Sequence, residues 1–451
     1  MSSDNQIIHG FSKMNSNEKL ELFIKKHSNP KEALELFKSF HHKNNKIQQL
    51  LEDFSENTVT NFPLPYSICP NVLLNGKSLL VPMVIEESSV VAAAANSAKF
   101  WFTRGGFKTE IIDTEKIGQV HFLWNDDKQL LIDRFDELKD VLNKDCFDIT
   151  ENMVRRGGGI NSIELRDLSD EEPGLMQLYA RFETIDSMGA NFINSCLEQF
   201  KSSFEKWHQN QPEFRKDGLE VIMCILSNYT PNCKVRCTVE TTIDQLDGVV
   251  KGMTGKEFAR RFRLGVRIAE VDSHRATTHN KGIMNGIDSV ILATGNDFRA
   301  VEACAHTYAS RSGKYSSLSH CEIKDDKFVF SLEIPFAVGV VGGLTNLHPL
   351  VKLSLELLDN PSAQEVMSIA ATIGLANNFS AVKNLVTVGI QQGHMKMHLL
   401  NILNQLEVPE KFKPEIIEYF KDKVVSVSSV RNLAEKRNMI PKEYINQSYD
   451  K

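Results

Sequence analysis

Residues 275–286 read Arg-Ala-Thr-Thr-His-Asn-Lys-Gly-Ile-Met-Asn-Gly, and apolar residues recur at helical spacing from there to Ile291. A helix here would place Lys281 and Asn285, four residues apart, on one face. Glycines within a helix are costly unless something must approach the backbone closely. A lysine on such a helix can stabilise an oxyanion formed from a carbonyl group, although a surface lysine is the simpler interpretation. The segment therefore predicts a helix that carries a candidate site.

Two further polar groups follow this segment. Asp297 closes the run Thr-Gly-Asn-Asp at a loop-to-helix junction, where it can serve a site or cap the next helix. His394 and His398 stand four residues apart, which is the spacing of a metal pair. No third ligand is indicated and no His-Glu-x-x-His is present, so we predict no metal. A histidine is commonly structural, but it is also the natural proton donor near neutral pH.

Upstream, Glu86 and Glu87 stand between an apolar strand-like run and an alanine-rich stretch that predicts a helix over residues 88–99. A carboxylate at such a junction can be partly buried, which raises its pKa and suits a general acid. Compensation of the helix dipole is the competing interpretation.

No ordinary dinucleotide fingerprint is present in the chain. The glycines at 339, 342 and 343 follow a strand-like run, but their spacing is not Gly-x-Gly-x-x-Gly, and a tight turn is the favoured role. A better candidate is the segment 186–191, Asp-Ser-Met-Gly-Ala-Asn, which lies between a predicted strand and a predicted helix. Small residues at a helix start let backbone amides approach a pyrophosphate, and a capped, tightly packed helix is the alternative.

Composition sets the broad class of protein. The chain has 451 residues, which suggests two or three domains. Its formal net charge of -6 is spread along the sequence without a basic face, which argues against a nucleic-acid partner. Eight cysteines at irregular spacing indicate reduced cytosolic thiols. The first 26 residues are polar and no apolar run could span a bilayer, so we expect a soluble, cytoplasmic protein.

Residues 108–230 alternate between strand-like and helix-like patterns. The clearest predicted strands lie at 119–123, 178–185 and 219–226, and the predicted helices at 127–143 and 188–204. The order strand, helix, strand, strand, helix, strand suits a small split βαβ domain. The first fifty residues predict helices, one of them opened by a capping box between Asn15 and Glu18.

Taken together and in this order, the motifs resemble class II 3-hydroxy-3-methylglutaryl-coenzyme A (HMG-CoA) reductases over nearly the full length of the chain. The segments that carry the resemblance are residues 64–65, 75–76, 81–83, 86–94, 186–191, 225–228, 275–286, 293–297, 338–343 and 393–395. Agreement across so many separated motifs is far more specific than any single motif.

The resemblance implies a role for each matching residue. Four residues match the family's catalytic acid, lysine, aspartate and histidine, namely Glu87, Lys281, Asp297 and His394. Three match positions that hold the HMG group, namely Ser89, Arg275 and Asn285. Five match the non-Rossmann nicotinamide site, namely Asp186, Met188, Gly189, Asn191 and Asn228.

The resemblance also implies the reaction, a four-electron reduction of HMG-CoA to mevalonate and coenzyme A with two molecules of NADH or NADPH. Lys281 would stabilise a hemithioacetal oxyanion, His394 would protonate the leaving thiolate, and Glu87 would supply the last proton. Asp297 would lie near Lys281 and Glu87 and couple their titrations. Arg275 would hold the distal carboxylate of the substrate in a fork.

The implied fold class is α+β. A large mixed helical and sheet domain, residues 1–109 and 230–385, would bind HMG-CoA and form dimers. An inserted small ferredoxin-like domain, residues 110–229, would bind the dinucleotide without a Rossmann fold, and residues 386–451 would form a helical flap. The flap must move because the cofactor is exchanged midway. The active site would lie at the interface of a homodimer or a larger homo-oligomer.

The chain departs from the family pattern at a few positions. Ser88 replaces a usual proline, Ser187 replaces a usual alanine, and Asn377 stands where a glutamine is common, but none of these removes a reacting group. One rival hypothesis is an acyl-CoA or aldehyde dehydrogenase with a cysteine nucleophile. Another is a binding protein on this fold that has lost its activity. The choice between NADH and NADPH and the physiological direction stay open.

Overall fold

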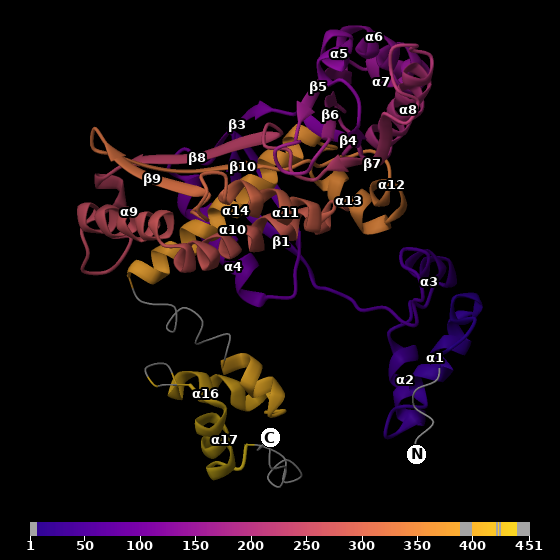
Figure 1. Cartoon of the computed structure of the whole chain (residues 1–451). Coiled ribbons are helices and arrows are strands. Elements are labelled where there is room, and N and C mark those ends of the chain that lie inside the picture. Colours follow the sequence, from indigo (N-terminus) through magenta and orange to yellow (C-terminus); the bar gives the residue numbers. More distant parts are fainter. Residues whose placement is uncertain (1–6, 388–398, 421–422, 424, 440–451) are drawn as a thin grey trace.

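The computed structural model describes residues 7–387, 399–420, 423 and 425–439. Its first part is a group of short helices: η1 (Phe11–Lys13), α1 (Ser16–Ile24), α2 (Pro30–Ser39) and α3 (Asn45–Glu52). The predicted capping box is confirmed, because Asn15 Oδ1 accepts from the Glu18 amide at 3.0 Å and Glu18 Oε2 accepts from the Asn15 amide at 2.9 Å. An extended segment then leads from these helices into the first strand (Figure 1).

The largest part of the molecule combines two antiparallel sheets with long helices. Its strands are β1 (Tyr66–Leu74), β2 (Lys77–Val84), β3 (Lys108–Asp113), β8 (Lys234–Thr242), β9 (Ser319–Lys324) and β10 (Lys327–Pro335). Its helices are α4 (Ser88–Phe102), η2 (Asp244–Leu246), α9 (Gly255–Val271), α10 (Ser273–Ala293), α11 (Phe298–Ala309), α12 (Leu344–Leu347), α13 (Pro349–Leu357) and α14 (Ala363–Val386). Strands β1 and β2 form a hairpin, and the other sheet has the order β3-β8-β10-β9.

Helices α10 and α14 pack side by side at the centre of this part, on one side of the β3-β8-β10-β9 sheet (Figure 1). Helix α14 is apolar and buried on nearly every side, as a central helix must be. A Cβ atom at Gly286 would lie 2.5 Å from the carbonyl oxygen of Ile373, so only glycine allows the two backbones to approach this closely. The second glycine of the opening segment therefore has a packing role.

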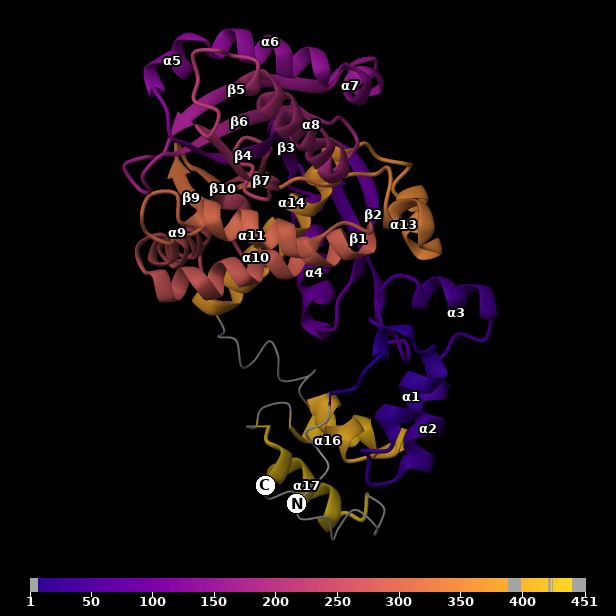
Figure 2. The ribbon, with the colours of Figure 1, turned by 45° about the vertical axis from the view of Figure 1, so that its right-hand side comes forward.

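A smaller unit, inserted between β3 and β8, contains one four-stranded sheet. Its strands are β4 (Lys116–Trp124), β5 (Gly159–Asp167), β6 (Leu175–Glu183) and β7 (Leu219–Ser227). Its helices are α5 (Lys128–Asp133), α6 (Phe135–Asp145), α7 (Phe147–Val154) and α8 (Ala190–Gln209). We call it the small unit. The order β5-β6-β4-β7 with antiparallel pairing is the predicted ferredoxin-like arrangement, and Figure 2 shows the helices on one side of the sheet.

The structure corrects the sequence prediction in detail. The helix predicted over 127–143 is broken at Arg134, where α5 ends and α6 begins. The glycines at 157–159 lead directly into β5, and Gly159 is its first residue. Large aromatic side chains such as Phe122, Phe204 and Trp207 form a core of the small unit that is separate from the core around α14.

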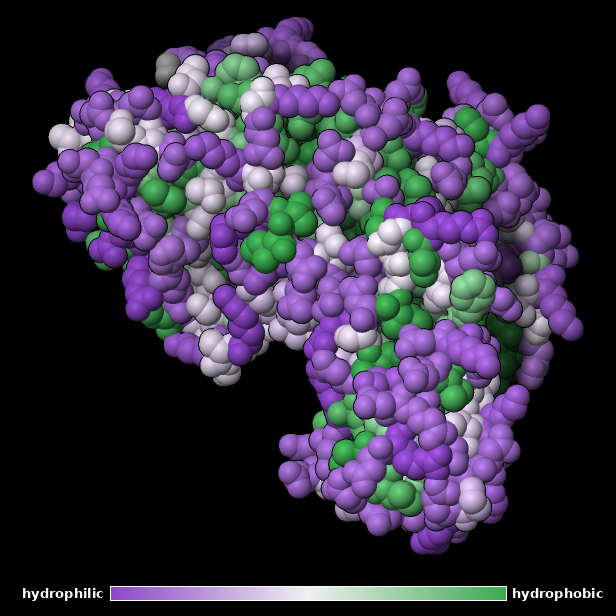
Figure 3. Space-filling view, turned by 90° about the horizontal axis from the view of Figure 1, so that it is seen from above, coloured by the Kyte–Doolittle hydropathy of each residue, from purple (hydrophilic) through white to green (hydrophobic). Residues whose placement is uncertain are grey.

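The C-terminal part contains η3 (Glu410–Phe412), α16 (Lys413–Tyr419) and α17 (Val427–Lys436). Its buried apolar side chains, including Leu403, Ile416 and Val430, form a third cluster. None of the helices in the described ranges is long and apolar enough to cross a bilayer. Hydrophilic residues cover most of the face in Figure 3, with small apolar areas between them.

Candidate active site

The first predicted site residues meet where α4 begins. Glu87 is the N-cap residue of α4, but its carboxylate does not cap the helix. Instead Glu87 Oε2 lies 3.1 Å from Lys281 Nζ of α10, and Glu87 Oε1 accepts a hydrogen bond from Ser89 Oγ at 2.8 Å. The side chains are partly open to solvent, with 62% of Lys281 and 40% of Glu87 exposed. A carboxylate and an ammonium group therefore stand side by side where a ligand can reach them.

A cavity of about 250 Å³ opens beside this pair. It lies between α4, α10 and α14, and its lining includes Glu87, Ser89, Asn96, Gly282, Asn285, Asn377, Ser380 and Asn384. A Cβ atom at Gly282 would have no neighbour within 4 Å, so this glycine keeps the wall next to Lys281 open. Carboxylate, hydroxyl and amide groups thus converge on one small space, which suits a polar acyl group.

Arg275 lies on α10 before Lys281 and does not line this cavity. Its side chain forms no ion pair with any residue in the described ranges, and burial lowers its pKa. Burial, reinforced by the charge of Arg275, also lowers the pKa of His279 to about 3, and His279 Nε2 lies 2.6 Å from Ser319 Oγ. His279 is therefore a neutral structural residue, whereas Arg275 offers an unpaired guanidinium to an anionic ligand.

Asp297 is the N-cap residue of α11 and accepts hydrogen bonds from the amides of Arg299 and Ala300 at 3.0 and 3.3 Å. Its carboxylate also pairs with the Arg299 guanidinium, with Nε and Nη2 each 3.0 Å from an oxygen. Burial acts to raise the pKa of Asp297, but Arg299 and the two amides outweigh it and leave the pKa below its usual range. The sequence-based interpretation of Asp297 as a helix cap therefore holds, and its carboxylate is ionised near neutral pH.

The structure does not bring Asp297 next to Lys281 within one chain. Helix α10 runs from Lys281 to its end at Ala293, and Asp297 follows after a short loop. A rise of 1.5 Å per residue puts Lys281 roughly 18 Å from the end of α10. The two residues therefore lie toward opposite ends of this stretch, and the structure shows no contact between them within the described ranges.

The segment Asp186–Asn191 connects β6 to α8 and is held by the large part of the molecule. Asp186 Oδ1 accepts from the Ala363 amide at the start of α14 at 2.9 Å. A Cβ atom at Gly339 would lie 2.4 Å from the Met188 amide nitrogen, so this glycine permits a close approach of two loops. Gly189 has φ of 92°, which favours glycine, and precedes the first turn of α8. The sequence interpretation of Gly339 as part of a turn missed this contact.

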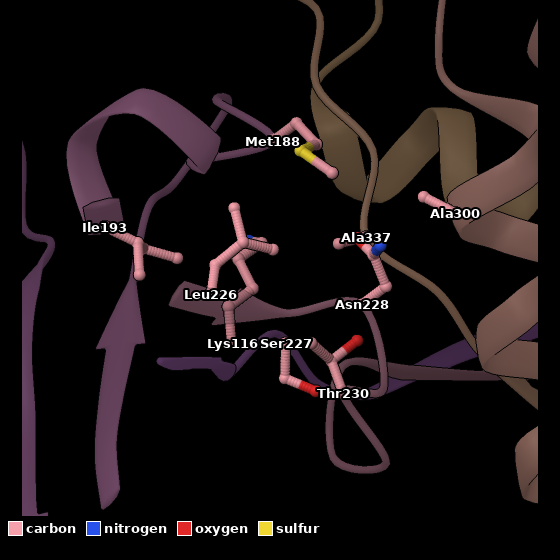
Figure 4. A pocket seen from close by; sticks show the side chains of 9 residues that line it. All are labelled: Lys116, Met188, Ile193, Leu226, Ser227, Asn228, Thr230, Ala300 and Ala337. Atoms are coloured by element: carbon pink, nitrogen blue, oxygen red, sulfur yellow. The ribbon is translucent and has the colours of Figure 1, made fainter. Parts of the chain in front are cut away.

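A small cavity of about 10 Å³ brings two predicted cofactor residues together. Figure 4 shows Met188 from the loop before α8 and Asn228 from the end of β7 around the same space, with Ala300 of α11 beside them. Lys116, the first residue of β4, also lines it, and sequence reasoning missed this residue because nothing local distinguishes it. The cavity lies between the small unit and α11, the helix that Asp297 caps.

Two predicted site residues, Asn191 and His394, are not among the described residues that line either cavity. Asn191 is exposed on the first turn of α8, outside the residues that line the cavity. His394 lies outside the described residues. The rival hypothesis of a cysteine nucleophile gains no support, because the cysteines are buried or half-buried and burial raises the pKa of Cys69, Cys233 and Cys237 to about 12.

Helix α10 also carries an acid whose charge state differs from that of Asp297. Burial, together with a hydrogen bond that the protonated Asp288 carboxyl donates to Glu302 of α11, raises the pKa of Asp288 to about 8. The folded protein therefore keeps a proton that the unfolded chain releases at about pH 4. The stability that this proton contributes is complete below about pH 4 and is lost progressively as the pH rises to about 8.

We expect Asp288→Asn, which is neutral at every pH, to remove this dependence. The free energy of unfolding of the wild type should fall relative to that of the variant between pH 5 and 8, by up to about 1.4 kcal/mol per pH unit, and its melting temperature should fall with it. Thermal unfolding across this range measures the effect. Asp326→Asn, in the exposed turn between β9 and β10, is the control and should follow the wild type. Parallel curves for wild type and Asp288→Asn would contradict the expectation.

Comparisons with known proteins agree with this geometry. A family model described as hydroxymethylglutaryl-coenzyme A reductase matches residues 17–399. The 3-hydroxy-3-methylglutaryl-coenzyme A reductase of Archaeoglobus fulgidus is 37% identical over 352 residues, which are 77% of this chain and 76% of that protein. A protein named as a probable enzyme of this kind in Borreliella burgdorferi is 32% identical over 93% of this chain and 92% of its own length.

Solved structures give the same result. The 3-hydroxy-3-methylglutaryl-coenzyme A reductase of Streptococcus pneumoniae is 35% identical, covers 95% of this chain and 99% of its own, and has a TM-score of 0.71. A structure of the class II enzyme from Streptococcus pneumoniae, bound to NADPH in open conformations, is 36% identical with a TM-score of 0.70, over 84% of this chain and 99% of its own. This chain therefore belongs to the hydroxymethylglutaryl-coenzyme A reductase family of oxidoreductases.

Proposed function

We propose that this chain reduces HMG-CoA to mevalonate and coenzyme A with two molecules of a nicotinamide cofactor, NADH or NADPH. The observation that carries the proposal is the contact between Lys281 Nζ and Glu87 Oε2, 3.1 Å apart, beside a polar cavity of about 250 Å³. A thioester reduction needs a cation where negative charge develops on oxygen and an acid that supplies a proton to it. The pair provides both groups at one place.

Each residue at the pair has a distinct role. When the thioester carbon accepts the first hydride, its oxygen becomes an anion that the Lys281 ammonium group stabilises. The hemithioacetal then breaks its carbon–sulfur bond, and His394 donates a proton to the departing thiolate. When the resulting aldehyde accepts the second hydride, Glu87 protonates the alkoxide. Ser89 holds Glu87 in place through their hydrogen bond of 2.8 Å.

The substrate is held by groups around the cavity. Asn285 faces it one turn beyond Lys281, and its amide can bind the 3-hydroxyl or the carbonyl group of the acyl chain. Arg275 has no ion pair among the described residues and binds the distal carboxylate. The amides of Asn96, Asn377 and Asn384 complete a polar wall that excludes a purely hydrocarbon acyl group.

A nicotinamide cofactor binds over the mouth of the second cavity, beside Met188 and Asn228, because the cavity itself has room for only about one water molecule. The cofactor supplies hydride equivalents to the substrate carbon. Helix α8 directs its N-terminal end toward this site, and the close approach at Gly339 keeps the loop 186–191 fixed there. A helix N-terminus favours the phosphates of a dinucleotide. Asp186 acts indirectly, because its carboxylate ties the loop to the start of α14.

The complete active site is shared between two subunits of a homodimer. In one chain the cofactor cavity lies beside α11, whereas Lys281 lies roughly 18 Å before the end of α10, too far for hydride transfer. A two-fold axis places Asp297 and the cofactor cavity of one chain against the Glu87–Lys281 pair of the other. There Asp297 of the partner subunit can contact Lys281 and couple its titration.

Each of the three proposed domains has its own function and its own apolar core. Residues 1–109 and 230–385 form the substrate-binding and dimerisation domain, residues 110–229 the cofactor-binding domain, and residues 386–451 the flap that carries His394. The separate apolar clusters around α14, within the small unit and in the C-terminal helices support a division into these three parts, and the pairing of β3 with β8 moves residues 110–113 into the large domain.

The proposal is tested by following cofactor absorbance with HMG-CoA as substrate. We expect about two molecules of NADH or NADPH to be oxidised for each HMG-CoA consumed, because a four-electron reduction requires two hydrides. Separate assays with each cofactor give the preference. Absence of turnover with both cofactors, and in reverse from mevalonate, coenzyme A and the oxidised cofactors, would refute the proposal and favour a binding protein.

A further inference from the structure

The cofactor cavity contains a charged residue that the proposed mechanism does not use. Of the nine residues that line it, Lys116 alone carries a charge, and the others are apolar, hydroxyl or amide side chains. Only 3% of Lys116 is exposed. Burial deprives an ammonium group of its hydration, which is unfavourable unless an anion or several acceptors compensate for it. The position therefore needs an explanation.

No acid in the part of the chain that the structure describes supplies that compensation. Lys116 forms no ion pair and no side-chain hydrogen bond with any residue in the described ranges. The neighbouring acids are engaged elsewhere: Glu115 pairs with Arg181 at 3.2 Å, and Glu183 accepts from the Ile185 amide at 2.7 Å. Because these carboxylates already have partners, the lysine is available to an anion that comes from outside the chain.

The surroundings of Lys116 favour a phosphate oxygen. The cavity has room for about one water molecule, which suits a single oxygen atom at its mouth and not a ring. The mouth lies between Met188, just before the N-terminal end of α8, and the exposed Asn228 (Figure 4). The helix dipole and the ammonium group thus attract an anion to the same point.

We infer that Lys116 binds a phosphate group of the nicotinamide cofactor at the mouth of this cavity. The inference rests on the proposed function, because it assumes that this site receives a dinucleotide. Either the diphosphate bridge or the 2′-phosphate of NADPH can supply the oxygen, and the two sources differ in a measurable way. Loss of affinity for both cofactors identifies the bridge, whereas loss for NADPH alone identifies the 2′-phosphate.

The test compares the full-length protein with Lys116→Met, which keeps the apolar stem and removes the charge. Two readouts separate a ligand-binding lysine from a structural one. Fluorescence titration with NADH and NADPH gives Kd, and we expect an increase of at least about tenfold for one or both cofactors. Thermal unfolding without ligand should show a melting temperature equal to or above that of the wild type, because an uncompensated buried charge is gone.

The matched control is Lys206→Met on the exposed face of α8, which should leave Kd unchanged. If Lys116→Met does not fold, the wild type is titrated with ADP and with adenosine 2′,5′-bisphosphate at rising salt. One of these probes must then bind with a Kd that increases with salt. Equal Kd values in wild type and Lys116→Met, or salt-independent binding, would overturn the inference alone. Failure of the wild type to bind either cofactor would overturn the proposed function as well.

Discussion

Replacement of Lys281 by alanine is expected to lower kcat for HMG-CoA reduction by roughly a thousandfold. The ammonium group lies 3.1 Å from Glu87 Oε2 beside the polar cavity, where the substrate oxygen acquires its charge. Because this interaction forms as the charge develops, the loss should fall on kcat and leave KM nearly unchanged. Initial rates over a range of HMG-CoA concentrations measure both quantities.

The matched control is Lys256→Ala, which removes an exposed lysine from α9. It lowers the positive charge of the protein by the same amount and should leave kcat unaltered. Unfolding of the Lys281→Ala protein is not expected, since the Lys281 side chain is 62% exposed and contributes little to packing. A variant that retains wild-type kcat would show that Lys281 does not act on the reacting oxygen.

Much of the fold could be predicted from local patterns. The capping box at Asn15 and the strand and helix order of the small unit follow from short-range spacing, and both are present. The broken helix at Arg134 could not be predicted, because apolar periodicity continues across the break. Tertiary packing in the small unit decides where the chain turns.

Some residues of the candidate site could likewise be predicted from the sequence, and others could not. The family resemblance implied one site made by Glu87, Ser89, Arg275, Lys281, Asn285, Asp297 and His394. The structure places Glu87, Ser89 and Asn285 around one cavity, and Lys281 contacts Glu87 beside it. The sequence did not show that Asp297 lies apart from Lys281. The separation follows from the straight course of α10 between them, and this course is set by the packing of α10 on α14. Lys116 was missed for a related reason: a buried cation is recognisable only by the absence of a partner in three dimensions.

The central claim is that each active site combines the Glu87–Lys281 pair of one chain with Asp297 and the cofactor cavity of its partner. Co-expression of two inactive variants tests this claim. Lys281→Ala removes the cation, and Asp297→Asn removes the carboxylate while retaining a residue that caps α11 well. A mixed dimer has one site with both residues intact and one site that lacks both.

The measurement is the activity of a mixed population purified through different tags on the two chains. Purification through both tags retains only mixed dimers, in which one of the two sites is intact, so activity should reach about half of the wild-type value, although each variant alone is nearly inactive. If purified mixed dimers show no more activity than the separate variants, Lys281 and Asp297 act within one chain, and the shared active site is wrong.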